Sequence, residues 1–177
     1  TDADRSKGLS ILMVETKDLP GYRVGRVLDK MGMHGQDTSE LFFEGVKVPV
    51  ENLLGGAEGQ GMHQLMNDLP RERLIVAVHA QAMIERALAL TLDYVKQRQA
   101  FGKKIIEFQN TQFVLAECKS EATIGRVFHD HCIERYLAGA LDTVTASMAK
   151  YWLTDLQGKV IDRCLQLFGG YGYMEEF

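Results

Sequence analysis

Residues 69–98 read LPRERLIVAVHAQAMIERALALTLDYVKQR, and this stretch decides the fold. Its apolar residues recur at three- and four-residue steps with charged residues mostly between them, as an amphipathic helix requires. The apolar positions on which we rely are Leu74, Ile75, Val78, Ala82, Ala89, Leu92 and Val95. Pro70 suits a first helical turn, where its missing N–H costs no bond. We therefore predict a helix over residues 70–98, after a short helix that ends near Asn67 and Asp68.

The same apolar spacing predicts two further long helices. One is expected over residues 109–138 and stops at Gly139, and the next begins with Asp142 as its N-cap and ends at Gly169 and Gly170. The apolar contacts expected in the first of these are Phe113, Leu115, Ala116, Ile124, Val127, Phe128, Cys132 and Leu137. Those expected in the second are Ala146, Ala149, Trp152, Leu153, Leu156, Val160, Ile161, Cys164 and Leu167. Such stripes predict an up-down antiparallel bundle. Because four helices close a core better than three, a fourth helix is expected after Phe177.

The N-terminal third has a different pattern. Short apolar runs at residues 10–14 and 41–43 lie between turn signals at residues 19–21 and 31–35, which is strand-and-turn spacing. Strands this few and short do not make a stable sheet alone, so residues 1–56 are expected to be the C-terminal part of a larger β domain. The glycine-rich residues 55–61 act as the connector, and residues 57–177 form the helical domain. The fold class is thus α+β, and the polar start without Met and the end just after a Gly-Gly-Tyr-Gly turn predict further chain at both ends.

Composition excludes several classes of protein. The 177 residues contain 20 Lys and Arg against 24 Asp and Glu, a formal charge of −4 without any long block of one sign. This charge pattern argues against nucleic-acid binding and against a polybasic membrane patch. No apolar run reaches the roughly 20 residues of a membrane helix, so no integral membrane contact is expected. The three cysteines form no CxxC pair and are interpreted as buried thiols in a reducing compartment.

One carboxylate has a setting that could support catalysis. Glu72 lies near the start of the predicted helix, and residues 74–82 after it carry no charge unless His79 is protonated. A carboxylate that loses water beside an apolar surface is a candidate general base, although Arg71 and Arg73 oppose that effect. The plainer alternative is a glutamate in a first helical turn, favoured by the helix dipole and paired with a neighbouring arginine.

Six motifs resemble, in order and spacing, those of the acyl-CoA dehydrogenase family. They are KMGMHGQDTSELFFE at residues 30–44, VPVENLLG at 48–55, LPRERL at 69–74, YVKQRQAFGK at 94–103, MAKYW at 148–152 and QLFGGYGY at 166–173. The Pro-x-Glu-Arg-Leu stretch is most similar to that of the long-chain type. The resemblance implies the end of a middle β domain and most of a C-terminal helical domain, a four-helix bundle without its last helix.

The resemblance also implies a reaction and its residues. Members of the family convert a fatty acyl-CoA thioester into a trans-2-enoyl-CoA, with FAD as the hydride acceptor and a glutamate as the base that takes the α proton. Most members carry this base in late helices, whereas long-chain and isovaleryl-type members carry it at the position matching Glu72. Pro70, Arg71 and Arg73 then become the expected substrate-binding residues. Pro70 stands where several relatives place an aspartate that contacts CoA, which leaves that contact open.

The same resemblance assigns cofactor-binding residues. Those expected to contact FAD are Arg98, Phe101, Gln109, Gln166, Leu167, Phe168, Gly169 and Gly170. Arg98 would reach the pyrophosphate and Phe101 the adenine of a neighbouring subunit's FAD, which implies a homodimer or homotetramer. Without the resemblance, Arg98 is a helix-end cation, Gln109 a polar first-turn residue, Phe101 a core anchor and the glycine pair a helix cap.

Three alternatives remain open. The electron acceptor could be an electron-transferring flavoprotein, or oxygen, as in related oxidases and monooxygenases. The chain by itself could instead be a non-catalytic helical oligomerisation piece.

No metal site is expected, because His129 and His131 in His129-Asp130-His131-Cys132 diverge on a helix and no second cluster completes a site. The expected location is the cytoplasm of a bacterium or the mitochondrial matrix of a eukaryote.

Overall fold

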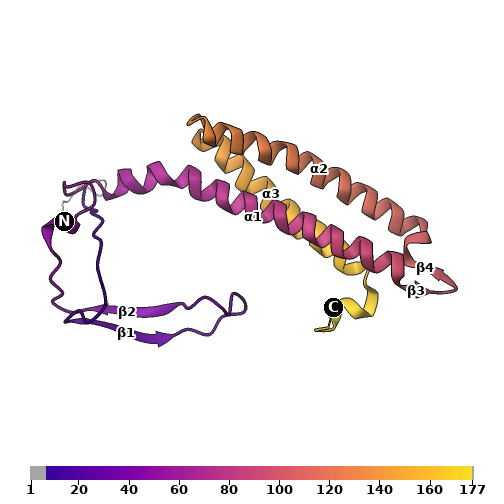
Figure 1. Ribbon diagram of the computed structural model, residues 1–177, viewed down its shortest axis with the longest axis horizontal. Helices are drawn as coiled ribbons and strands as arrows, with labels where there is room; N and C mark the ends of the chain where they lie inside the picture. Colours follow the sequence, from indigo (N-terminus) through magenta and orange to yellow (C-terminus); the bar gives the residue numbers. More distant parts are fainter. Residues whose placement is uncertain (1–6, 177) are drawn as a thin grey trace. The chain divides into compact units, whose positions relative to one another are not determined.

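The computed structural model describes residues 7–176, so expectations about residues 1–6 and Phe177 lie outside it (Figure 1). The chain divides into two compact units, Thr1–Met66 and Asn67–Phe177. The division lies inside a helix, ten residues beyond the boundary expected between residues 56 and 57. A helix continues across this division, so the boundary between the two units lies beyond the glycine-rich residues 55–61.

The first unit contains one two-stranded antiparallel hairpin. Strand β1 (Tyr22–Val27) pairs with β2 (Ser39–Phe43), and a register shift between Val24 and Val27 interrupts the ladder. The strand expected at residues 10–14 is wrong, because only an isolated bridge between Leu12 and Leu53 forms there. A short 3-10 helix, η1 (Val50–Asn52), precedes that bridge. Apolar side chains of the hairpin stay about half exposed, which fits strands that need further structure to cover them: Val24, Val27, Leu41 and Phe43.

The first long helix, α1, runs unbroken over Gly61–Gln97 and contains Pro70. The expectation of two helices separated before Pro70 is therefore wrong. Pro70 has no N–H to donate to the carbonyl of Met66, yet the helix continues through the lost bond, as proline within a helix can when the surroundings compensate. Met66 is half exposed, and it is also the last residue of the first unit.

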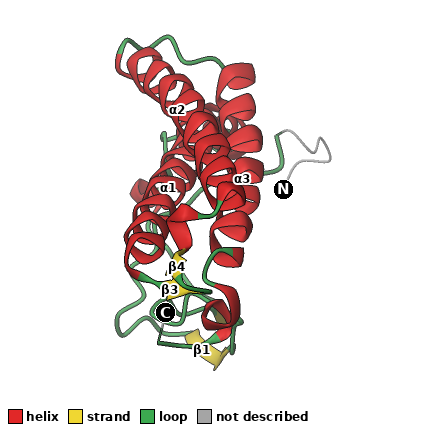
Figure 2. Cartoon of the chain, turned by 90° about the vertical axis from the view of Figure 1, so that its right-hand side faces the viewer, coloured by secondary structure: helices red, strands yellow, loops and turns green. Residues whose placement is uncertain are grey.

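Helices α2 (Gln109–Leu137) and α3 (Thr143–Gln166) run alongside α1 (Figures 1 and 2). The short strands β3 (Gln99–Ala100) and β4 (Lys103–Lys104) and the 3-10 helix η2 (Ile105–Glu107) connect α1 to α2, and η3 (Gly169–Tyr173) follows α3. Both predicted helix signals are confirmed. The N–H of Thr145 donates to Oδ1 of Asp142 at 2.8 Å, and Gly139, beyond the end of α2, has φ +66°.

Two apolar clusters give the direction of the helices. The first joins Leu74, Ala77 and Ala80 to Cys132 and to Ala149 and Leu153, and the second joins Ile84 to Cys118 and Ala122 and to Leu156, Val160 and Cys164. Residue numbers rise along α1 from one cluster to the other, fall along α2 and rise along α3. Neighbouring helices are therefore antiparallel in the order of the chain. The predicted fold class, a partial β domain followed by an up-down helical bundle, is confirmed.

The buried faces of the helices agree with the sequence analysis only for α3. Its buried residues are Ala146, Ala149, Leu153, Leu156, Val160 and Cys164, all of which were expected. In α1 the expectation for Ile75, Val78, Ala82, Ala89 and Leu92 is wrong, because the buried residues besides Leu74 and Val95 are Gly61, Ala77, Ala80, Gln81, Ile84 and Thr91. In α2 the bulky Phe113, Ile124, Val127 and Leu137 are exposed, and Thr111, Cys118, Ala122, Gly125, His129 and Cys132 are buried. Small residues face the neighbouring helices because they let two backbones approach closely.

Helix α1 is long and apolar enough, by length and composition alone, to cross a membrane. One side of this helix packs against α2 and α3, and Ala77, Ala80 and Ile84 on that side are fully buried. This packing is what the core helix of a bundle shows.

Candidate functional site

A cavity of about 720 Å³ lies where α1 and α3 end and α2 begins. Its lining comes from the end of α1, the β3–β4 hairpin, η2, the first turn of α2, the end of α3 and η3. The structure brings together in this cavity all the expected cofactor residues except Gln109: Arg98, Phe101, Gln166, Leu167, Phe168, Gly169 and Gly170. Residues that lie 68 positions apart at Arg98 and Gln166 thus share one wall.

The hairpin places Phe101 at the cavity in a strained conformation. Phe101 and Gly102 form its two-residue turn, and both have positive φ, +52° and +79°. Glycine adopts this region freely, whereas a bulky aromatic residue rarely does. The Phe101 side chain is 94% exposed, and its ring meets the edge of the Phe108 ring at 6.4 Å. The strained backbone of Phe101 and its exposed ring beside a cavity favour a binding role over a core role.

The cavity wall carries a fixed positive charge. Arg98 directly follows α1, and its backbone is held at both ends: its N–H donates to the carbonyl of Tyr94 at 2.8 Å, and its carbonyl accepts from Ile105 at 2.9 Å. Its guanidinium lies over the ring of Tyr171, with the guanidinium carbon 4.7 Å from the ring centroid. No carboxylate within residues 7–176 forms an ion pair with Arg98. The wall is therefore suited to an anion.

The glycine pair forms an open part of the wall. A Cβ added to Gly169 or Gly170 would meet nothing within 4 Å. Gly169 has φ +59°, which explains a glycine there by backbone conformation, but Gly170 has no such φ. Neither conformation nor packing among residues 7–176 requires a glycine at position 170. Close approach of a bound molecule would require one.

Sequence reasoning missed several residues of this cavity, among them Tyr94, Phe108, Asn110 and Tyr171. The expected residue Gln109 is the exposed first residue of α2 and does not line the cavity, although Asn110 and Thr111 do. One signal for Tyr94 was present: it precedes Arg98 by four residues, so both lie on one face of a helix.

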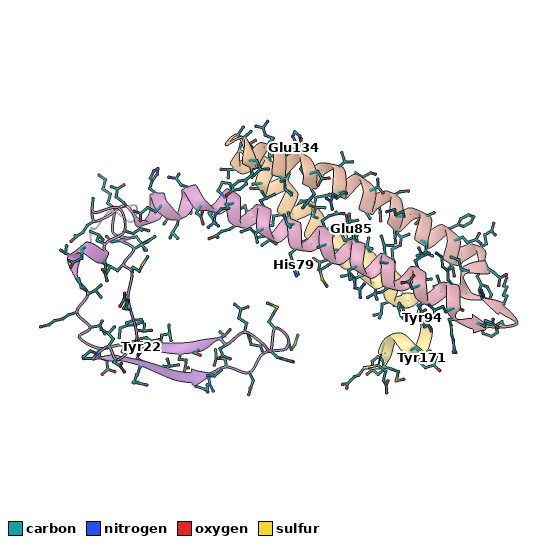
Figure 3. The ribbon with its side chains drawn as sticks, in the orientation of Figure 1. Tyr22, His79, Glu85, Tyr94, Glu134 and Tyr171 are labelled. Carbon is teal, nitrogen blue, oxygen red and sulfur yellow. The ribbon has the colours of Figure 1, made fainter. Side chains whose placement is uncertain are left out.

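Glu72 lies far along α1 from this cavity, on an exposed strip of the helix. The strip consists of Glu72, Ile75, Val76, His79 and Met83, which share one face of α1 by their spacing; Figure 3 labels His79. Ile75, Val76 and Met83 are 55%, 40% and 40% exposed. The Glu72 carboxylate therefore stands at one end of a mostly apolar surface that the described chain leaves open, with Asp68 one turn before it.

The arginines on either side of Glu72 point elsewhere, because consecutive helical residues diverge by about 100°. Both nitrogens of one edge of Arg71 bond Asp68, at 2.7 and 2.8 Å, and this contact holds the pKa of the Asp68 carboxyl below its ordinary value. Arg73 is half-buried and donates to the hydroxyl of Ser147 at 2.9 Å, which ties α1 to α3. Neither arginine neutralises Glu72 through a direct contact.

The described residues hold no group of three or more His, Cys, Asp or Glu placed to bind a metal ion. In the segment that suggested ligands, His129 and Cys132 are buried while His131 is exposed. His129 Nδ1 instead lies 2.9 Å from Oδ1 of Asp130.

Comparison with known proteins assigns the chain to a family. A sequence model of the acyl-CoA dehydrogenase C-terminal domain matches residues 59–177. The chain is 46% identical over 170 residues to the mitochondrial long-chain specific acyl-CoA dehydrogenase of Mus musculus, covering 96% of this chain and 39% of the relative. The chain therefore belongs to the acyl-CoA dehydrogenase family, and it spans about two fifths of the length of this relative.

Solved structures agree with this assignment. The crystal structure of an acyl-CoA dehydrogenase from Geobacillus kaustophilus matches with a TM-score of 0.93 and 49% identity, over 99% of this chain and 46% of that one. Butyryl-CoA dehydrogenase from Megasphaera elsdenii matches with a TM-score of 0.92 and 37% identity, over 100% of this chain and 46% of that one.

Proposed function

We propose that the protein containing this chain is a flavin-dependent dehydrogenase that converts a fatty acyl-CoA thioester into a trans-2-enoyl-CoA. The observation that carries the proposal is the cavity that gathers Arg98, Phe101 and residues 166–170 in a member of this family. The proposed acyl-CoA substrate follows from the names of the relatives, since the mouse and Megasphaera proteins are acyl-CoA dehydrogenases. The proposed flavin rests on the family resemblance of Arg98, Phe101 and residues 166–170.

The residues around the cavity fit part of an FAD molecule. A guanidinium without a carboxylate partner suits the pyrophosphate, because its planar fork of N–H donors can bind two phosphate oxygens. The open backbone at Gly170 allows close approach, and the exposed ring of Phe101 offers a stacking surface for adenine. When bound, FAD supplies the acceptor for the hydride that leaves the β carbon.

Glu72 is the proposed base that takes the α proton of the thioester. It stands at the end of the exposed strip formed with Ile75, Val76, His79 and Met83, where an acyl chain and a flavin ring would displace water. Loss of water favours proton uptake by a carboxylate, which is what the reaction requires of the base. The proposed part of Arg73 is to hold this turn of α1 against α3 through Ser147. Pro70 and Arg71, two and three residues after Asp68, are proposed to border the bound CoA.

The spacing of the two sites supports an oligomer. Glu72 and Arg98 are separated by 26 residues of helix, or about 40 Å. One extended FAD molecule is shorter than this distance, so the two residues of one chain would serve two different flavins. A second copy of the chain, in a homodimer or homotetramer, would complete each site. Electron-transferring flavoprotein is the proposed electron acceptor, in the bacterial cytoplasm or the mitochondrial matrix.

Anaerobic reduction of the flavin tests this proposal. The full-length protein should bind FAD, and a long-chain acyl-CoA should bleach its absorbance. Glu72→Gln should abolish the bleaching while FAD stays bound, because an amide cannot accept the α proton. Glu134→Gln, at an exposed glutamate of α2 labelled in Figure 3, is the matched control and should bleach normally.

The other outcomes separate the alternatives. Normal bleaching in Glu72→Gln would place the base elsewhere. Rapid reoxidation of the reduced flavin by oxygen would indicate an oxidase or monooxygenase, and a full-length protein that binds no FAD would leave the non-catalytic role.

A further inference from the structure

Two side chains at the end of α1 contact the segment after α3 in matching register. The ring of Tyr94 stacks on that of Phe168, with centroids 4.2 Å apart and 15° between the planes, and the Tyr94 hydroxyl donates to the Phe168 carbonyl at 3.2 Å. Arg98, one helical turn later, lies over the ring of Tyr171. Residues four apart share one face of an α-helix and residues three apart align in a 3-10 helix, so the two contacts are parallel. Figure 3 labels Tyr94 and Tyr171 at this end of the bundle.

The contact with Tyr171 does not use the hydrogen-bond donors of the Arg98 side chain. A cation over the face of an aromatic ring is attracted electrostatically, so this contact requires none of the guanidinium N–H donors. The Arg98 backbone is already held by its hydrogen bonds to Tyr94 and Ile105. The contact with the aromatic ring additionally restricts the rotations of the long Arg98 side chain. The guanidinium is thereby held at the cavity wall with its donors open to an oxyanion.

We propose that Tyr171 is the positioning residue for Arg98, and that its ring holds the guanidinium where it meets the pyrophosphate of FAD. This inference rests on the proposed binding of FAD in this cavity. The neighbouring Gly170, which residues 7–176 leave uncovered on its Cβ side, places open backbone directly beside Tyr171. The aromatic ring, the cation and the open backbone therefore belong to one wall of the cavity.

The expected effect is modest and has a definite sign. A cation–aromatic contact at an exposed site corresponds to about a two- to five-fold change in an equilibrium constant. Loss of the ring should therefore weaken FAD binding by about two- to five-fold. A phenylalanine should keep the affinity, because the attraction comes from the ring and not from the hydroxyl.

A double-mutant cycle tests the inference in the full-length protein. The flavin is removed, and FAD is titrated into wild type, Tyr171→Phe, Tyr171→Leu, Arg98→Gln and the Arg98→Gln Tyr171→Leu double variant. Circular dichroism at 222 nm checks that each variant is folded, and Tyr171→Met replaces the leucine variant if that one is not. Tyr171→Leu should weaken binding in the wild-type background and have no further effect in the Arg98→Gln background, because the ring acts through Arg98.

Every other result contradicts a specific part of the inference about Tyr171. Equal weakening by Tyr171→Leu in both backgrounds would mean a structural role that does not pass through Arg98. An unchanged or tighter affinity in Tyr171→Leu would show that the ring is idle or sequesters the cation, and a Phe variant as weak as Leu would assign the effect to the hydroxyl. If wild type binds no FAD, the proposed function itself fails, whereas FAD binding without any effect of Tyr171 overturns only this inference.

Discussion

Replacing Gly125 by alanine should destabilise the bundle, although alanine is the better helix former. Gly125 is buried in α2, and a Cβ there would lie 2.6 Å from Oε1 of Gln81 and 3.1 Å from Cδ2 of Leu153. The Gln81 side chain is 1% exposed, and its Nε2 already donates to the Ala122 carbonyl at 3.0 Å and to Glu85 at 2.9 Å. The added methyl group must therefore displace a side chain that is fixed on its other side.

The magnitude follows from opposing terms. Alanine gains about 1 kcal/mol of helix propensity over glycine. Overpacking of a filled core costs about 1–3 kcal/mol, and each Gln81 hydrogen bond that is lost costs about 1 kcal/mol more. We expect Gly125→Ala to lower the free energy of unfolding by about 1–2 kcal/mol.

Gly158→Ala is the matched control. Gly158 lies in the middle of α3, and its Cβ would meet nothing within 4 Å, so the propensity gain of up to about 1 kcal/mol should appear undiminished. Urea unfolding of the full-length protein, followed at 222 nm, measures both variants. If Gly125→Ala stabilises the protein as much as Gly158→Ala does, the close approach at Gly125 does not limit the side chain, and the reasoning is refuted.

Two further predictions concern titration and thiol chemistry. Hydrogen bonds from Thr145 hold the pKa of the Asp142 carboxyl below its ordinary value, so its contribution to stability is present above the unfolded-state pKa and is lost as pH falls through the folded-state pKa. Wild type should therefore lose stability relative to Asp142→Asn below about pH 4, and a difference that stays constant from neutral to acid pH would contradict this. Burial raises the pKa of the Cys118 and Cys132 thiols, and Cys164 is only 3% exposed. All three should resist iodoacetamide in the folded protein and react in denaturant, as measured by mass spectrometry of the peptides that contain them, and labelling of the native protein would disprove their burial.

Helix existence could be predicted from the sequence, but the buried face of a helix could be predicted only for α3. In α3 the buried residues Ala146, Ala149, Leu153, Leu156, Val160 and Cys164 follow one another at three- and four-residue steps, and the sequence period identified all six. In α1 and α2 apolar residues surround the helix, and period alone cannot choose between two apolar faces. The structure buries small residues such as Ala77, Ala122 and Gly125 and leaves Ile124 and Val127 more than 60% exposed, because close approach of two helices selects small side chains.

The candidate site divides in the same way. Ordered motifs indicated Arg98, Phe101 and residues 166–170, and the structure gathers them in one cavity. Tyr171 was part of a quoted motif but had no predicted role, since its importance depends on a contact with a residue 73 positions earlier. Gln109 carried a predicted role but lies outside the cavity, because neighbouring residues at a helix start point in different directions.

The sequence by itself determined the family, the three long helices and the caps at Asp142 and Gly139, because these depend on motifs and on local backbone chemistry. It also indicated Glu72, through the charges and apolar residues within two turns of it. Only the tertiary structure decided that α1 continues through Pro70, that Arg73 is occupied by Ser147, and that Arg98 stands over Tyr171. The contacts of Arg73 and Arg98 join residues far apart in the chain, and their free energies appear only when the helices have packed. The continuation through Pro70 goes against the local preference of proline for a first helical turn.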